Sequence, residues 1–196
     1  MPHPECNCAP KGLSRRTSQT IHLVEYVKEE SASHDMIVYA KDHLYEYLFR
    51  FLASELYAVL AERLGELSEY LFTYVPRSRE KSAARGVDQS KEVAKRLAKM
   101  ADADFGSLLI HRDTVEQKHL SAEERKQNTK RSYDLREKSK DCIRGRHIIV
   151  YDDVITTGAT LLACVSLLKQ AGAADVTVLT FGKTYRGDQR SKTPIV

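Results

Sequence analysis

The run of residues from His147 to Thr160, HIIVYDDVITTGAT, constrains the fold of this chain more than any other segment. Residues 147–151 are rich in β-branched and aromatic side chains, as is typical of a strand buried inside a parallel sheet. Asp152 and Asp153 follow at the point where we expect this strand to leave the sheet. A small-residue turn, TTGAT, then leads into an apolar helix. This order predicts a ligand site beyond the carboxyl ends of the strands, where open α/β sheets bind their ligands.

The turn formed by Thr156, Thr157, Gly158, Ala159 and Thr160 has the composition of an anion site. Small side chains let backbone N–H groups close around a phosphate, and the N-terminus of the following helix adds partial positive charge. Two acids beside such a turn suit a ligand that carries both a phosphate and hydroxyl groups, and a sugar phosphate fits. The chain contains neither GxxxxGK[ST] nor GxGxxG, so those phosphate-binding motifs are excluded.

A strand, a capped loop and a helix can also form a purely structural unit. Such units rarely combine adjacent acids with TTGAT, so we favour the ligand-binding interpretation. The segment VYDDVITTGAT resembles the phosphoribosyl-pyrophosphate (PRPP) signature of type I phosphoribosyltransferases. The resemblance implies that Asp152 and Asp153 fix and polarise the ribose through its hydroxyls and help to hold Mg²⁺. It also implies that residues 156–160 hold the 5′-phosphate.

Two further stretches resemble the ComF-like, or competence-protein, branch of these enzymes. Residues 75–89 read VPRSREKSAARGVDQ and residues 112–128 read RDTVEQKHLSAEERKQN, in the order VP…R…RGxxQ and R…T…Q…L…ER…N of that branch. The resemblance covers residues 37–184, most of the chain. The family usually has an aromatic residue and Asn before the Gln of RGxxQ, and here Val87 and Asp88 stand in their place. This departure removes support for a stacking or amide contact at those two positions.

Basic side chains in these stretches complete the predicted site. The resemblance implies that the loop with Arg77, Ser78 and Arg79 meets the pyrophosphate of PRPP, and guanidinium groups suit that role because they bind phosphate oxygens in a bidentate fork. A solvated basic loop is the alternative.

Residues 111–131 occupy the place of the mobile hood of type I enzymes and include Arg112 as a candidate ligand contact. A helix with exposed charge pairs is the alternative for this stretch.

Tyr185 follows the last predicted strand, in the region that usually recognises the acceptor in this fold. Its ring could stack on a base or simply pack.

A length of 196 residues suits one domain with one sizeable core. We expect a poorly ordered tail over residues 1–20, a phosphoribosyltransferase-like domain over 21–190 and a C-terminal tail over 191–196. No apolar run approaches the roughly 18 residues that span a bilayer, and the N-terminus lacks the apolar stretch of a secretory signal. We therefore expect no membrane insertion and a cytoplasmic location.

The net charge of +4 suits an anionic ligand and is too weak by itself to indicate nucleic-acid binding.

The four cysteines do not form a recognisable metal site. ComF-like proteins often carry an N-terminal zinc module with two CxxC pairs, and this chain lacks that pattern. Cys6 and Cys8 form a CxC beside His3, which gives three ligands at most where a structural zinc needs about four. An unliganded tail is therefore favoured over a degenerate half-site or a metal site shared between chains. Cys164 is predicted to be buried on the helix after the TTGAT turn.

Apolar periodicity predicts alternating strands and helices along the chain. The clearest helix has apolar residues at spacings of three and four from Leu44 to Leu64. The other expected elements are strands over 21–27 (an edge strand), 35–40, 70–75, 107–110, 147–151 and 176–181, and helices over 89–100 and from the TTGAT turn to about residue 170. This alternation and the resemblance together predict the α/β class: a type I phosphoribosyltransferase fold with a mostly parallel, Rossmann-like sheet flanked by helices and a mobile hood segment.

Two classes of function are open at this point. The completeness of the predicted site favours a phosphoribosyltransferase that moves ribose 5-phosphate from PRPP to an unidentified nitrogen nucleophile and releases pyrophosphate. The alternative is a non-catalytic PRPP-binding protein or a DNA-uptake or DNA-processing accessory of the competence type, with single-stranded DNA or DNA-processing proteins as partners. A PRPP synthetase is disfavoured because the chain is too short for paired domains and shows no ATP site. A homo-oligomer is compatible with the sequence, which identifies neither the acceptor nor the oligomeric state.

Overall fold

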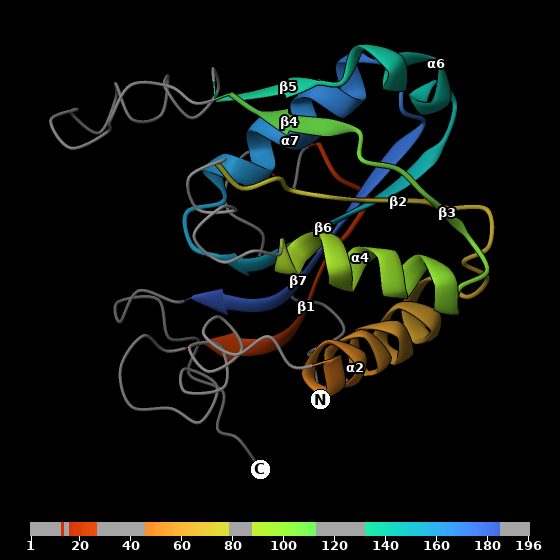
Figure 1. The fold of residues 1–196 in the computed structure, drawn as a ribbon, viewed down its shortest axis with the longest axis vertical. Coiled ribbons are helices and arrows are strands. Elements are labelled where there is room, and N and C mark those ends of the chain that lie inside the picture. The colour runs from red at the N-terminus through yellow and green to blue at the C-terminus, as the bar shows by residue number, and fades with distance from the viewer. Residues whose placement is uncertain (1–12, 14–15, 27–45, 79–87, 113–131, 185–196) are drawn as a thin grey trace, which may run out of the picture.

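The described residues of the computed structural model are 13, 16–26, 46–78, 88–112 and 132–184. They form a central five-stranded sheet with helices on both faces, and a small second sheet of two strands (Figure 1). The strands are β1 (Thr20–Tyr26), β2 (Leu71–Tyr74), β3 (Asp104–Phe105), β4 (Leu109–His111), β5 (Tyr133–Leu135), β6 (His147–Ile155) and β7 (Asp175–Thr184). The helices are α2 (Glu46–Leu64), α4 (Gln89–Met100), the 3₁₀ turn η2 (Glu137–Ser139), α6 (Lys140–Ile143) and α7 (Ala159–Gln170).

The central sheet has the strand order β1-β7-β6-β2-β3, and every neighbouring pair in it is parallel. Parallel strands place all their carboxyl ends at the same edge of the sheet, and the arrowheads of β1 and β7 mark that edge in Figure 1. β1 is an edge strand, as the sequence predicts. The predicted α/β class with a mostly parallel sheet is confirmed, whereas the strand predicted over 35–40 lies outside the described residues.

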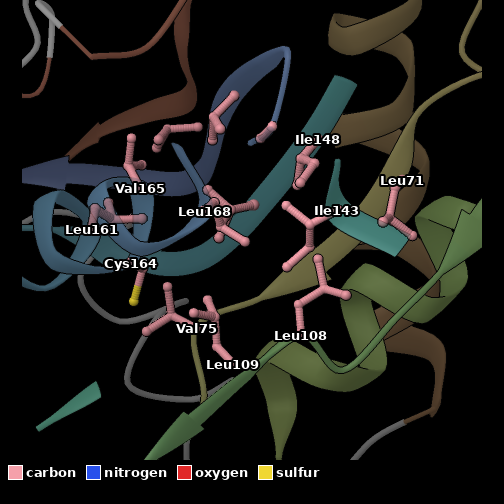
Figure 2. Close-up of a cluster of buried hydrophobic side chains, with 14 of the residues drawn as sticks. Leu71, Val75, Leu108, Leu109, Ile143, Ile148, Leu161, Cys164, Val165 and Leu168 are labelled. Atoms are coloured by element: carbon pink, nitrogen blue, oxygen red, sulfur yellow. The ribbon is translucent and has the colours of Figure 1, made fainter. Parts of the chain in front are cut away.

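Each face of the sheet carries its own apolar core. Ile148 and Val150 of β6 pack with the α7 side chains, whereas Ile149 and Tyr151 pack with α2 and α4. A strand that is buried on both faces needs apolar residues at successive positions, which explains the continuous apolar run 148–151. Figure 2 shows the α7 side of this core, where Cys164 lies among the apolar side chains and has no exposed surface, as predicted.

The strand predicted over 147–151 is longer in the structure, because β6 continues through both acids to Ile155. β7 supports the extension with pairs from Asp152 opposite Thr180 to Ile155 opposite Lys183. On the other side, pairing with β2 ends at Tyr74 opposite Tyr151. Asp152 and Asp153 therefore lie inside β6, which corrects the expectation that they follow the strand. They nevertheless stand beyond the last β2–β6 pair, so no residue of β2 pairs with them.

The strand predicted over 107–110 is found as β4, which covers residues 109–111 and lies in the small second sheet. β3 ends at Phe105, and the Gly106 N–H donates to the Phe72 carbonyl oxygen at 2.9 Å before the chain leaves the central sheet. Leu108 and Leu109 are adjacent and both 1% exposed, which a strand with one buried face does not allow. β4 instead pairs antiparallel with β5, with His111 opposite Tyr133.

The predicted bounds agree with the structure for α4, and packed residues occur closer to the N-terminus than expected. α4 covers residues 89–100 as predicted, and its apolar stripe of Val93, Ala94 and Leu97 is at most 2% exposed. Near the N-terminus, Leu13 is 1% exposed in the core, and the Ser18 N–H donates to the Val176 carbonyl oxygen at 3.2 Å. The predicted domain boundaries stay predictions, although packed residues occur before position 21.

In the described parts of the chain, no helix combines the length and the apolar character that crossing a membrane requires.

Candidate functional site

Two half-buried carboxyl groups, those of Asp152 and Asp153, mark the candidate site at the carboxyl edge of the central sheet. The Asp153 N–H donates to Asp152 Oδ1 at 2.9 Å, and the Val154 N–H donates to Asp153 Oδ1 at 2.8 Å. These local bonds orient both carboxyl groups. β2 ends before the level of the two acids, so their neighbour on this side is the loop after β2, which carries Arg77.

The Asp152 carboxyl group has a pKa well above its ordinary value of 3.8. Burial is the main cause, because it disfavours the charged form, and the negative charge of Asp153 and a hydrogen bond between the two carboxyl groups add to it. The guanidinium group of Arg77 opposes the rise. Two acids placed this close repel each other, so the site favours a bound cation or bound hydroxyl donors.

This raised pKa predicts that Asp152→Asn stabilises the ligand-free protein at neutral pH. The folded state binds the Asp152 proton more tightly than the unfolded state, so the free energy of unfolding of the native protein falls as pH rises from about 4 through the folded pKa. The gain from Asp152→Asn is on the order of 1.4 kcal/mol for each unit by which folding raises the pKa. Urea unfolding at pH 4 and pH 7 measures it, and the variant should differ from native at pH 7 only.

Asp153→Asn is the matched control for that measurement. This change removes the ion pair of Asp153 with Arg77, so we expect no gain in stability at pH 7. An equal gain from both substitutions, or a gain from Asp152→Asn that is the same at both pH values, would contradict the assigned origin of the effect.

Arg77 connects the loop after β2 to the acids and to α4. Its Nη2 donates to Asp153 Oδ2 at 2.9 Å and to Gln89 Oε1 at 3.2 Å. Asp88, the N-cap residue of α4, accepts from the Lys91 N–H at 3.3 Å. Burial raises the pKa of Asp88, and the N–H groups of Lys91 and Arg77, which donate to its carboxylate, oppose that rise. Arg77 is thus held by α4 through its guanidinium group.

The TTGAT turn leaves the N-terminus of α7 without a side-chain cap. Gly158 is the N-cap residue and has a left-handed backbone, φ 72° and ψ 5°, which favours glycine. Thr156 and Thr157 are exposed, and the Thr157 hydroxyl accepts a long bond of 3.4 Å from the Ala159 N–H. The first-turn amides of a helix need acceptors, and an anion can supply them. The turn therefore offers an anion site one short loop away from the acids.

Tyr133 is a site neighbour that the sequence analysis missed. Its pKa is raised by burial, and the nearby Cys164 and Asp152 add to the effect, while a hydrogen bond with Thr160 opposes it. Its ring also packs edge-on against His111, with 5.0 Å between the ring centroids. Tyr133 therefore links the β4–β5 pair to the first turn of α7.

Comparison with known proteins gives the family. The model of the phosphoribosyl transferase domain matches residues 83–193, which include the acids and the TTGAT turn. The chain belongs to this family. Its relatives place it in the ComF-like branch, as the sequence resemblance suggests. The predicted type I phosphoribosyltransferase fold is confirmed with it.

Two curated relatives illustrate the branch. The chain is 36% identical over 102 residues to DNA utilization protein YhgH of Salmonella typhi, covering 51% of this chain and 43% of that protein. It is 32% identical over 139 residues to competence protein ComFC of Streptococcus pneumoniae, covering 69% and 60%. The chain spans about half the length of the curated relatives it matches. A solved structure, glutamine PRPP amidotransferase from B. subtilis, is similar over 74% of this chain and 30% of that one, at 17% identity and a TM-score of 0.49.

The carboxylate pair fits a magnesium ion. Mg²⁺ takes oxygen ligands and is commonly held by one or two carboxylates together with substrate phosphates. Asp152 and Asp153 offer two such groups, and their mutual repulsion would be relieved by a cation. No cluster of three or more His, Cys, Asp or Glu that could hold a metal occurs in the described ranges. Water molecules and a bound ligand would complete the coordination of the ion.

The remaining predicted residues divide into two groups. Arg112 and Ser78 are described, and the Arg112 guanidinium group forms an ion pair with Asp134 across the β4–β5 pair. Ser78 is half-buried directly after Arg77. Arg79 and Tyr185 lie outside the described residues, so their predicted roles stay predictions. Among the described residues, no hydrogen bond or ion pair joins Arg112 to Asp152 or Asp153.

Proposed function

We propose that this chain binds PRPP with Mg²⁺ and transfers its ribose 5-phosphate unit to an unidentified nitrogen nucleophile, with release of pyrophosphate. The observation that carries the proposal is the meeting of three groups at one edge of the sheet. These groups are the paired acids of β6, the uncapped N-terminus of α7 and the guanidinium group of Arg77. PRPP carries one partner for each group: two ribose hydroxyls for the acids, a 5′-phosphate for the N-terminus of α7 and a pyrophosphate for Arg77.

Each group has a separate task in this proposal. The amides and hydroxyls of the TTGAT turn bind the 5′-phosphate, which fixes one end of the ligand. The ribose hydroxyls donate to Asp152 and Asp153, and hydrogen bonds to charged acceptors are the stronger kind. Arg77, with Ser78 and Arg79, binds the pyrophosphate. Arg112 and Tyr185 are proposed to contact the ligand and the acceptor.

Positioning and electrostatics supply most of the catalysis in this proposal. The bond from ribose C1 to pyrophosphate breaks while the bond from C1 to the nitrogen forms, and the ribosyl centre gains positive charge in between. In this proposal the Asp152 and Asp153 carboxylates, bound to the ribose hydroxyls, stabilise this charge. Arg77 stabilises the departing pyrophosphate, and the two anchored ends hold C1 for attack. Bound Mg²⁺ would supply further neutralisation of the pyrophosphate charge.

The names of the relatives favour one alternative function. These proteins are named for DNA utilization and for competence. A PRPP-binding protein without turnover, or an accessory of DNA uptake or DNA processing, would use the same site to sense PRPP. Such a protein would be expected to bind single-stranded DNA or a DNA-processing partner elsewhere on its surface.

A pyrophosphate-release assay separates the two functions. The protein is incubated with PRPP, Mg²⁺ and a panel of nucleobases and amines, and we expect release that depends on one class of acceptor. The variant Asp152→Asn with Asp153→Asn is the negative control. PRPP binding without release for any acceptor, together with salt-sensitive binding of single-stranded DNA, would instead support the alternative.

A further inference from the structure

We propose that Gln89 is a positioning residue that holds the Arg77 guanidinium group toward the pyrophosphate end of the ligand. The inference rests on the proposed function, because it concerns how a ligand-facing side chain is held. Gln89 is the last residue of the RGxxQ element, to which the sequence analysis assigns no role.

The contact that carries the inference joins the first residue of α4 to the loop after β2. Gln89 is 7% exposed, and its Oε1 accepts from Arg77 Nη2 at 3.2 Å. The same nitrogen donates to Asp153 at 2.9 Å, and the Arg77 side chain is 17% exposed. One nitrogen of the guanidinium group therefore lies between a neutral acceptor on α4 and a charged acceptor on β6.

Gln89 is the first residue of a helix whose apolar face is buried in the core. Val93, Ala94 and Leu97 of α4 pack into the core with at most 2% exposure. Asp88, one residue earlier, caps the helix by accepting from the Lys91 N–H at 3.3 Å. The start of α4 thus holds the side chain of Arg77, so a long and flexible side chain is ordered before the ligand arrives.

The amide chemistry of Gln89 suits this task. A neutral amide oxygen orients the guanidinium group without cancelling its charge, whereas a carboxylate at the same position would form a competing ion pair. The guanidinium group presents five N–H donors, so the remaining donors stay available for phosphate oxygens. The bond to Asp153 holds the guanidinium group beside the acids in the absence of a ligand, and the bond to Gln89 can persist when the acids bind ribose.

The test compares two ligands that differ in the pyrophosphate alone. Calorimetric titrations with PRPP and with ribose 5-phosphate, both with Mg²⁺, are made on native protein, Gln89→Met, Arg77→Met and the double variant. We expect Gln89→Met to weaken PRPP binding about five- to tenfold and to leave ribose 5-phosphate binding unchanged. Arg77→Met should weaken PRPP binding by about 10- to 100-fold, and the double variant should be no weaker than Arg77→Met alone.

Ser90→Ala is the matched control for damage to the start of α4. Ser90 is the next residue along, is 1% exposed, and its hydroxyl has no hydrogen-bond partner in the described structure. We expect this variant to bind both ligands like the native protein.

The outcomes distinguish failure of this inference from failure of the proposed function. Equal loss of both ligands in Gln89→Met would indicate a general structural role and overturn the inference. Native PRPP affinity in Gln89→Met, or losses that add in the double variant, would also overturn it. Native protein that binds neither ligand would overturn the proposed function itself.

Discussion

Replacing both acids, Asp152→Asn with Asp153→Asn, is expected to weaken PRPP binding by on the order of 100-fold or more while the protein stays folded. Each carboxylate would lose a charge-assisted hydrogen bond to a ribose hydroxyl, and the pair would lose its ability to hold Mg²⁺. The protein should still fold, because the substitutions remove both the cost of burying a charge and the repulsion between the carboxyl groups, which together raise the pKa of Asp152. Titration calorimetry with PRPP and Mg²⁺ measures the loss of affinity, and thermal unfolding checks the fold.

The matched control is Asp102→Asn with Asp104→Asn, which changes the net charge by the same amount. Both residues are exposed. Asp104 is the first residue of β3 and Asp102 lies two residues before it, away from the acids of β6. We expect this control to bind PRPP like the native protein. If the control and the β6 variant lose affinity equally, general charge attraction explains the binding. If neither loses affinity, the assignment of the ribose to the two acids is wrong.

The second large effect is expected from Gly158→Val, which should also weaken PRPP binding by on the order of 100-fold. The left-handed backbone at Gly158, with φ 72°, is strained for a β-branched residue by about 1–3 kcal/mol. The turn would relax to another conformation and move the first-turn amides of α7 away from the phosphate. Calorimetry with ribose 5-phosphate measures this loss directly, because that ligand carries the same 5′-phosphate without the pyrophosphate.

Gly65→Val provides a control with the same backbone strain. Gly65 has φ 73°, follows the C-terminus of α2 at the opposite edge of the sheet, and has no atom within 4 Å of an added Cβ. Both valine variants should lose stability through the strained backbone, and Gly158→Val alone should lose phosphate binding. Equal affinity of the two variants for ribose 5-phosphate would contradict a phosphate site at the TTGAT turn.

The fold could be predicted where one segment carries its own pattern. The helices 89–100 and 159–170 follow from apolar periodicity, and the buried strand at 147 follows from its β-branched run. The end of β6 could not be predicted in the same way. It depends on the length of β7, a strand 28 residues further on, whose pairs extend to Ile155 and Lys183. Strand lengths and strand order are properties of pairing, and local composition does not encode them.

In the candidate site, too, the parts that are consecutive in the sequence could be predicted and the contacts between distant segments could not. The acids and the turn are consecutive in the sequence, so their motif could be found there. The contacts of Arg77 with Gln89 and Asp153 join three elements, with partners 12 and 76 positions away. The RGxxQ spacing marks Gln89 as a position of interest, but its role follows only from the place of α4 beside the end of β2. Tyr133 gave no signal, because a single tyrosine after a charged stretch has no motif around it.

A calorimetric titration of PRPP into the native protein, first with Mg²⁺ and then with EDTA, measures directly whether the site binds PRPP. We expect saturable binding of one PRPP per chain with Mg²⁺ and much weaker binding with EDTA, since the two acids would then face the ribose without a cation. Absence of binding in both conditions would contradict this expectation. The paired acids and the TTGAT turn would then be retained as parts of the fold without a PRPP-binding role.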